Sequence, residues 1–436
     1  MTDATADDAP ATPFKAGTYS YYVLFLLFLG YVMNFADRQV VAILAQDIKT
    51  DLGLSDTEMG LLTGPAIALF YAVLGVPMAY VADRVHRVRL LAICLVLWSG
   101  LTALGGVARN LVQLALTRVG VSIAEAGGTP ISASLLADYF PPERRATALG
   151  FYSAASAVGV LFGFALGGIV NDLVGWRWAM VAAGTPGVIL AVLMLLTLRE
   201  PKRGAADPGG VKAAKPATGS MWDTLKRIWS IPEYRRIVIA CSGANMSVYV
   251  LLAWAPSVAL RSFDVTSGQV GIFMGLGIAL LGAASLAGTG LMADAINKVS
   301  RVQPVRLIAL FQYLVVPLMI ATLFAPTFLL YMVAIAFAYA AIVSNSSVAW
   351  LVTQNATPPE MRASAAASMA LVFNLVGLGL GPPLVGFISD QLTVQYGDES
   401  LRYALMLVAV SSLVAGLLLS FWVVPAVKAR EAAGRR

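Results

Sequence analysis

Residues 141–172 read PPERRATALGFYSAASAVGVLFGFALGGIVND, and residues 358–390 return to the same pattern as PPEMRASAAASMALVFNLVGLGLGPPLVGFISD. Both stretches begin with Pro-Pro-Glu, place glycines at similar intervals and end on an aspartate. A second match agrees with the first, because LGLSDTEMG at 52–60 is echoed by FDVTSGQVG at 263–271. The offset is about half of the 436 residues, so the sequence predicts two halves built on one plan.

The composition is that of a membrane protein. Hydrophobic residues make up 58% of the chain and charged residues 12%, whereas a soluble domain carries about 25% charged residues. Mean hydropathy is +0.77. A bilayer core needs roughly 20 apolar residues per helix. Such runs are predicted at 19–46, 57–82, 89–107, 111–138, 146–170, 177–198, 236–260, 268–292, 304–323, 327–353, 363–389 and 401–425. The sequence therefore predicts an all-α polytopic membrane protein with twelve transmembrane helices.

The basic residues indicate the orientation of the chain in the membrane. The net charge is +6, yet the Lys and Arg residues form no single patch of the kind that binds nucleic acid. They gather in alternate loops and at the end of the chain, while the intervening loops carry aspartates and glutamates. By the positive-inside rule we expect both termini in the cytoplasm. In a bacterial cell the protein would lie in the inner (plasma) membrane.

The chain is expected to divide into five parts. These are a disordered tail at 1–18, a six-helix bundle at 19–198, a cytoplasmic linker at 199–235, a second six-helix bundle at 236–425 and a cytoplasmic tail at 426–436. Six helices repeated in one orientation imply two bundles related by a pseudo-two-fold axis along the membrane normal, with a binding site between them. In the linker, MWDTLKRIW at 221–229 is either an amphipathic helix on the inner leaflet or a continuation into the next span. We expect a monomer.

The loop between the second and third spans carries a motif. It reads AYVADRVHRV at 79–88. With this loop and the repeat, the chain resembles the major facilitator superfamily of transporters over essentially its whole length. The superfamily pattern is Gly-x-x-x-Asp-Arg-x-Gly-Arg-Arg; Asp83, Arg84 and Arg87 match it, and both glycines are replaced, by Ala79 and His86. The resemblance implies the major facilitator fold.

This loop and its counterparts are candidates for a gate. An aspartate at a helix end beside arginines can hold one bundle to the other through charge-assisted hydrogen bonds and a facing helix N-terminus. The candidate gating residues are Asp83, Arg84, Arg87, Arg145, Asp294 and Arg362. For Asp83 the alternative is a simple topology anchor. Glycines in the fifth and eleventh spans would let neighbouring helices approach closely.

The first span carries a narrower resemblance. Residues 34–62 read NFADRQVVAILAQDIKTDLGLSDTEMGLL. The core of Asn34, Asp37 and Arg38, followed by a Leu-Gly-Leu-Ser-Asp turn, looks like the Spinster family of lysolipid and sphingosine-1-phosphate transporters. Proton-coupled organic-anion symporters begin in a similar way. The resemblance implies an amphiphilic, lipid-like substrate, and the alternative is a small organic anion or a drug-like compound.

Four ionisable residues stand inside predicted spans, where charges are rare and mark function. They are Asp37 and Arg38 in the first span, and Arg118 and Glu125 in the fourth. Counting about 1.5 Å per residue places Asp37 at the depth of Arg118, so we expect these two to pair. Glu125 would favour its protonated form in an apolar cavity and is the candidate proton carrier, with Asp37 as a second coupling residue. Direct substrate contact or a structural pair are the alternatives for Glu125.

The second half holds almost no charge inside its spans, so the predicted cavity is lopsided. A charged wall facing an apolar and weakly polar one suits an amphiphile whose head meets Arg118; the alternative is that Arg118 only holds Asp37. The candidate substrate-binding residues are Arg118, Arg38, Asn34, Asn245, Tyr249, Trp350, Phe373 and Asn374. Each of those in the second half is also explained by ordinary packing or helix-to-helix hydrogen bonding.

Glycine and proline mark expected hinges. They stand at Gly64-Pro65, at Gly128 with Pro130, at Pro256 and at Gly381-Pro382-Pro383. Each weakens the backbone hydrogen bonding of a helix where a neighbour can compensate.

Other classes of protein find little support in the sequence. An enzyme would need a nucleophile with a base, or a metal cluster, and the single histidine is His86 in a loop. Cys94 and Cys241 have no paired spacing. A channel would need rings of charge or carbonyl filters. We therefore expect no catalytic residues, metal or cofactor, and expect the partners to be the substrate, protons and the bilayer.

Overall fold

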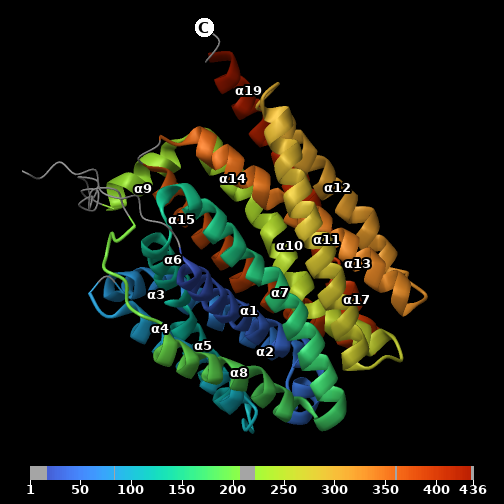
Figure 1. Ribbon diagram of the computed structural model, residues 1–436. Helices are drawn as coiled ribbons and strands as arrows, with labels where there is room; N and C mark the ends of the chain where they lie inside the picture. Colours follow the sequence, from blue (N-terminus) through green and yellow to red (C-terminus); the bar gives the residue numbers. More distant parts are fainter. Residues whose placement is uncertain (1–16, 83, 207–220, 359–360, 434–436) are drawn as a thin grey trace, which may run out of the picture.

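The computed structural model describes residues 17–82, 84–206, 221–358 and 361–433, which form helices and turns with no strand. Asp83, most of the predicted N-terminal tail, the middle of the linker and the last three residues lie outside this part of the chain. Figure 1 shows two groups of helices side by side, the first coloured blue to green and the second yellow to red. The two groups are the predicted halves.

The first half forms six helical rods. They are α1 (Thr18–Leu52), α2 with α3 (Asp56–Thr63 and Pro65–Ala82), α4 (Arg87–Gly105), α5 with α6 (Leu111–Glu125 and Gly128–Tyr139), α7 (Pro142–Val174) and α8 (Trp176–Thr197). A separate helix, α9 (Met221–Ser230), follows in the linker.

The second half repeats the plan. Its first four rods are α10 (Pro232–Ser262), α11 (Ser267–Asn297), α12 (Gln303–Leu323) and α13 (Phe328–Val343) with α14 (Asn345–Ala356). The fifth rod consists of α15 (Arg362–Phe373), η2 (Asn374–Leu380) and α16 (Gly381–Tyr396). After the short turn η3 (Gly397–Glu399), the sixth rod consists of α17 (Ser400–Ala404), α18 (Leu407–Leu418), η4 (Leu419–Val423) and α19 (Val424–Ala433). In the described part of the chain, 10 helices are long and apolar enough to cross a membrane. The predicted second and fourth spans correspond to the interrupted rods α2–α3 and α5–α6, so the twelve-helix fold is confirmed.

The interruptions fall where the backbone cannot continue its hydrogen bonds. α2 stops just before Pro65, which has no N–H to donate. α5 and α6 are separated at 126–127, next to the expected hinge glycine. The eleventh rod contains the π-helix η2, a feature frequent at functional sites. Pro256 lies inside the continuous helix α10, so its role as a hinge stays a prediction.

Two pairs of helices make the most extensive contacts between the halves. α7 packs along α11, and α2 packs along α16. In the sequence repeat α7 corresponds to α15–α16, and α2 to the start of α11, so the same contact is made twice, as a two-fold relation requires. The expected close approach of glycines occurs here: an added Cβ on Gly168 would collide with the backbone of Ser267, and one on Gly386 with the backbone of Asp56.

These joints close one end of the molecule. We call the end that carries α9 and α19 the linker end, and the opposite end, with the turns after α1, α7 and α10, the far end (Figure 1). The tight glycine contacts of α7 and α11 lie toward the far end. Nearer the linker end, an added Cβ on Gly150 or Gly288 would meet no atom within 4 Å. The bundles therefore touch at the far end and part toward the linker end.

The linker helix α9 packs on the second bundle. Ile228 is fully buried, and Trp229 Nε1 donates a hydrogen bond of 2.9 Å to Ser368 Oγ on α15. α9 ends at Ser230 and α10 begins at Pro232, so α9 is a helix in its own right and does not continue into α10. Its Lys226 and Arg227 remain exposed.

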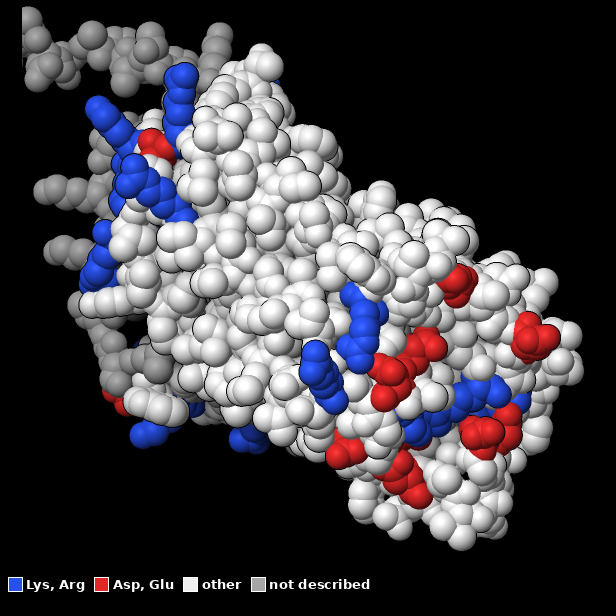
Figure 2. Space-filling model, turned by 90° about the horizontal axis from the view of Figure 1, so that it is seen from below, with Lys and Arg blue, Asp and Glu red and all other residues white. Residues whose placement is uncertain are grey.

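Charges separate along the molecule. Figure 2 shows basic side chains gathered toward the linker end, acidic side chains with a few basic ones at the far end, and an uncharged belt between them. The exposed far-end acids include Asp51, Asp264 and Asp398. An apolar belt between two charged ends is what a bilayer requires, and the chain is an integral multi-pass membrane protein.

Candidate functional site

A cavity lies between the two bundles, about midway along the rods. It encloses about 570 Å³ of empty space, part of it open to solvent. The first bundle contributes Phe35, Arg38, Gln39, Val41, Ala42, Thr63 and Arg118, and the second contributes Tyr249, Leu252, Ala253 and Leu378. The two cations stand on one wall, and the opposite wall is apolar except for a tyrosine.

Arg38 and Glu125 form the ion pair of this site. Arg38 Nη2 and Nε both donate to Oε2 of Glu125, at 2.8 and 3.0 Å. Glu125 is 1% exposed, while the side chain of Arg38 is 16% exposed. The bond joins α1 to α5 within the first bundle, and it leaves part of the guanidinium on the cavity wall.

The pair expected from the sequence was Asp37 with Arg118, and that expectation is wrong. Successive residues of a helix point about 100° apart, so Arg38 faces the cavity while Asp37 points into the first bundle. Asp37 is fully buried and Arg118 is 1% exposed. Among the described residues, neither oxygen of Asp37 and neither Nε nor Nη1 of Arg118 has a hydrogen-bond partner. Both are thus buried ionisable groups with no direct bond between them.

Tyr249 is the polar group of the second-bundle wall. Its hydroxyl donates a 2.9 Å hydrogen bond to Asn374 Oδ1 at the start of η2. Gly377 makes room for the ring, because an added Cβ would lie 2.7 Å from Tyr249 Cδ2. The π-helix therefore holds the tyrosine against the cavity.

The remaining predicted substrate residues lie elsewhere. Asn34 lines a separate pocket inside the first bundle. Asn245 is buried and donates to the carbonyl of Cys241 in its own helix, and Phe373 belongs to the packed core of the second bundle. Trp350 is 50% exposed and lines a hollow between α11 and α14 beside Asp294. Sequence reasoning missed Phe35, Gln39, Thr63 and Leu378, whose apolar or weakly polar character carries no signal of its own.

The predicted gating residues that the structure describes lie at the linker end. Arg87 is 1% exposed and bonds Asp138 Oδ2 and Glu200 Oε1, the latter at the start of the linker. Arg84 stacks on Tyr80, Arg145 Nε donates to a carbonyl of its own bundle, and Arg362 Nε does the same in the second bundle. These bonds do not join the bundles, which are apart at this end, so a role in the opposite conformation stays a prediction.

Bonds between the bundles are made at the far end, where none was predicted. Asp390 of α16 accepts hydrogen bonds from the backbone N–H of Asp56 and Thr57 at the N-terminus of α2, at 3.0 and 2.8 Å. Asp172 of α7 accepts one from Gly268 N at the N-terminus of α11, at 2.8 Å. A carboxylate at a helix N-terminus is favoured by the helix dipole.

The sequence held the signal for this arrangement. Asp172 and Asp390 occupy equivalent positions in the repeat, and the helix each one caps begins with a capping box, at Ser55 and at Thr266. The repeat therefore places an aspartate and a helix start together twice, once in each joint.

Comparison with known proteins agrees with this architecture. Residues 27–378 match the family model described as Major Facilitator Superfamily. The chain is 32% identical to an MFS-type efflux pump of Mycolicibacterium smegmatis over 90% of each chain, and 27% identical to Protein spinster homolog 1 of Xenopus tropicalis over 91% of this chain and 79% of that one.

A solved structure extends the likeness to almost the whole fold. The crystal structure of a bacterial homolog to the human lysosomal transporter Spinster, in an inward-facing and unoccupied conformation, superposes with a TM-score of 0.87. It is 26% identical, and the match covers 95% of this chain and 99% of that chain. The resemblance to the Spinster family is confirmed.

Proposed function

The chain belongs to the major facilitator superfamily and is a transporter, not an enzyme, and we propose that it moves an amphiphilic, lipid-like molecule with an anionic head by proton-coupled alternating access. The observation that carries the proposal is the lopsided cavity, with Arg38 and Arg118 on one wall facing Leu252, Ala253 and Leu378. Cations bind a phosphate or carboxylate head through charge-assisted hydrogen bonds. The apolar wall accommodates the hydrocarbon tail.

Glu125 couples the proton to the substrate through Arg38. While Glu125 is ionised, it occupies Arg38 through two hydrogen bonds. Protonation of Glu125 removes that charge, and an anionic head can then take the place of the carboxylate on Arg38. Substrate and Glu125 thus compete for one guanidinium. The contacts of Glu125 support Arg38, rather than Arg118, as the cation that its protonation releases. Asp37 is a second proton site in this proposal.

The linker end faces the cytoplasm in this proposal. Lys and Arg favour the cytoplasmic side, and they gather toward that end (Figure 2). The conformation described is then inward-facing. In the outward-facing state the far-end bonds break, and the linker-end group of Asp83, Arg84, Arg145, Asp294 and Arg362 closes. We place the transporter in a plasma membrane and propose that it works as a monomer.

Transport by proteoliposomes tests the proposal. Labelled sphingosine-1-phosphate, a lysophospholipid and a sugar acid would be offered with and without an imposed pH gradient. If one proton moves with each substrate, each pH unit can drive about tenfold accumulation. We expect gradient-dependent movement of the lipids, and we expect Glu125→Gln to bring accumulation down to equilibration.

Two results would contradict the proposal. Lipid uptake that is the same with and without the pH gradient would contradict the proton coupling. Full gradient-driven accumulation by Glu125→Gln with an unchanged pH profile would contradict the role of Glu125. Movement of the sugar acid alone would leave the transporter intact and favour the second candidate, a transporter of a small organic anion or drug-like compound. The paired cations Arg38 and Arg118 suit that candidate too; the apolar opposite wall is what favours the amphiphile.

A further inference from the structure

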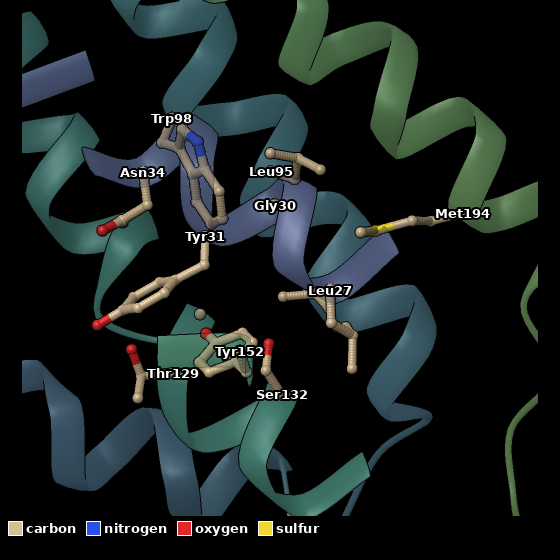
Figure 3. A pocket seen from close by; sticks show the side chains of 12 residues that line it. Leu27, Gly30, Tyr31, Asn34, Leu95, Trp98, Thr129, Ser132, Tyr152 and Met194 are labelled. Atoms are coloured by element: carbon tan, nitrogen blue, oxygen red, sulfur yellow. The ribbon is translucent and has the colours of Figure 1, made fainter. Parts of the chain in front are cut away.

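A pocket with charged walls lies inside the second bundle, at the linker end. It encloses about 380 Å³ of empty space, part of it open to solvent, between α10, α11, α12, α14 and α19. The pocket of the first bundle that Asn34 lines differs from it, because the side chains there are apolar, aromatic or small and polar (Figure 3). The polar lining of the second-bundle pocket consists of two arginines, one glutamate and two asparagines, which are Arg301, Arg430, Glu233, Asn297 and Asn355.

The sequence repeat shows which part of the first bundle this pocket corresponds to. RVRLLA at 87–92 returns as PVRLIA at 304–309, and DYFPPE at 138–143 returns as NATPPE at 355–360. Both shifts are of 217 residues, from 87 to 304 and from 138 to 355. By this register the positions of Arg87, Ser134 and Asp138 are taken in the second half by Pro304, Leu351 and Asn355.

In the first bundle these positions hold a filled charge cluster. The guanidinium of Arg87 is buried and donates hydrogen bonds to Asp138 Oδ2, to Ser134 Oγ at 2.9 Å and to Glu200 Oε1 at 2.6 Å. In the second bundle the residues at all three equivalent positions line the pocket. The pocket therefore lies where the first bundle places a guanidinium.

The charges around this position are inverted between the halves. In the first bundle, the carboxylates of Asp138 and Glu200 surround one cation. In the second bundle, Asn355 brings an amide in place of the Asp138 carboxylate. The last rod brings Arg430 to the pocket, whereas the chain after the last rod of the first half brings Glu200. The first bundle thus surrounds a cation with anions, and the second surrounds a space with cations.

The two arginines of the pocket retain the capacity to bind an anion. Arg430 Nη1 donates to the carbonyl of Ala356 at 3.0 Å and lies 3.5 Å from Glu233 Oε2, which is longer than a normal hydrogen bond. Arg301 is exposed, and no other described residue makes a hydrogen bond or an ion pair with it. Two positive charges therefore face one negative charge, and the amides of the two asparagines add further donors.

We propose that this pocket binds a phosphate group, held by Arg301 and Arg430 and by the side-chain amides of Asn297 and Asn355. Guanidinium groups match the oxygens of a phosphate in geometry as well as in charge. The bound group would connect the turn before α12 with the end of α14 and with the C-terminal helix α19. The proposal does not depend on the transported substrate, because this pocket and the substrate cavity share no lining residue.

Thermal unfolding of the full chain in detergent tests the site. A ligand that binds the folded state raises the midpoint of unfolding as its concentration increases. Inorganic phosphate would be compared with chloride at equal ionic strength, so that general screening of charges is the same in both. We expect phosphate to raise the midpoint by several degrees relative to chloride.

Two variants and a control assign the effect to the pocket. Asn355→Asp places a carboxylate where the first bundle has Asp138, with almost no change in side-chain shape, and Arg301→Gln removes a cation. We expect both to abolish the rise in midpoint that phosphate produces. Arg306→Gln is the matched control, because Arg306 is an exposed cation at the same end of α12 that does not line the pocket. It should keep the full rise.

A second arm of the experiment identifies the source of the phosphate group. Short-chain phosphatidylglycerol replaces inorganic phosphate, with a diacylglycerol of the same chain length as the lipid without phosphate. A rise with inorganic phosphate supports a site for the free anion, and a rise with phosphatidylglycerol alone supports a site for a lipid headgroup. No rise with either compound would overturn the proposal. A rise that persists in Asn355→Asp, or that Arg306→Gln also abolishes, would overturn it as well.

Discussion

Arg261 of the second bundle donates hydrogen bonds to both carboxylate oxygens of Asp56 in the first bundle, from Nη2 to Oδ1 at 2.6 Å and from Nη1 to Oδ2 at 2.9 Å. Lys49 and Ser389 also bond this carboxylate, at 2.6 and 2.7 Å, and Asp56 is 1% exposed. A buried, fork-shaped ion pair thus ties the two bundles at the far end. It has no equivalent in the α7–α11 joint, where Ser267 takes the position of Asp56.

Breaking this pair is expected to release the far end. Removing one partner of a buried pair costs up to roughly 3–5 kcal/mol when the other charge is left unpaired, and less here because Lys49 stays paired with Asp56. Arg261→Ala should therefore shift the population toward the state in which the bundles meet at the linker end. Spin labels on Gly150→Cys and Gly288→Cys, positions open enough to accept them, would report a shorter distance.

The control for that experiment is Asp51→Asn. Asp51 pairs with Arg177 at 2.7 Å, but this pair lies within the first bundle and both side chains are more than 40% exposed. The native cysteines, Cys94 and Cys241, are buried and should not take the label. An unchanged label distance in Arg261→Ala would show that the pair does not hold the far end closed.

The close glycine contact between α7 and α11 leads to a second prediction, which concerns thermal stability. An added Cβ on Gly271 would collide with the carbonyl oxygen of Phe164 on α7, whereas one on Gly288 of the same helix meets nothing within 4 Å. Overpacking of a close contact costs about 1–3 kcal/mol. Gly271→Ala should lower the midpoint of thermal unfolding in detergent, while Gly288→Ala should not. Equal midpoints would show that the contact between α7 and α11 accommodates the added methyl group without a loss of stability.

Arg87 is expected to matter for stability rather than only for gating. Arg87→Ala leaves Asp138 and Glu200 without their shared cation, and the loss should approach the roughly 3–5 kcal/mol of a broken buried pair, reduced because Glu200 is 22% exposed. Arg84, in the same loop, is exposed and stacks on Tyr80, so Arg84→Ala should leave the unfolding midpoint nearly unchanged. Thermal unfolding midpoints of the two variants, measured under the same conditions, check this prediction. Similar midpoints for both variants would refute an anchoring role for Arg87.

Tyr249 is expected to affect substrate affinity without affecting the coupling. Tyr249→Phe removes its bond to Asn374, and the loss of one such bond, about 1 kcal/mol, should raise the half-saturating substrate concentration about fivefold. The pH dependence of uptake should stay the same because Glu125 and Arg38 are untouched. Tyr313→Phe is the control, since Tyr313 makes a 2.9 Å bond to Ser420 in a different part of the second bundle. A changed pH profile of uptake in Tyr249→Phe would show that Tyr249 also affects the proton coupling.

Much of the architecture could be read from the chain alone. A bilayer demands about 20 apolar residues per helix, so span number and position follow from the lengths of apolar runs. The repeat between 141–172 and 358–390 made two related bundles the expected arrangement, and the glycines within it marked the close joints that α7 and α16 form. The four charged residues inside predicted spans also identified the site, since so few groups of that kind are tolerated there.

Tertiary structure decided how those charges combine. Each residue turns about 100° around its helix, so a small rotation of α1 determines whether Asp37 or Arg38 faces the cavity, and no local pattern encodes that rotation. It results from the packing of α1 against α7 and the other helices of the bundle. The same holds for Asp56 and Arg261, which are 205 residues apart and meet only because the bundles close at the far end. The sequence thus determined which residues stand in the membrane, and packing between helices determined which of them touch.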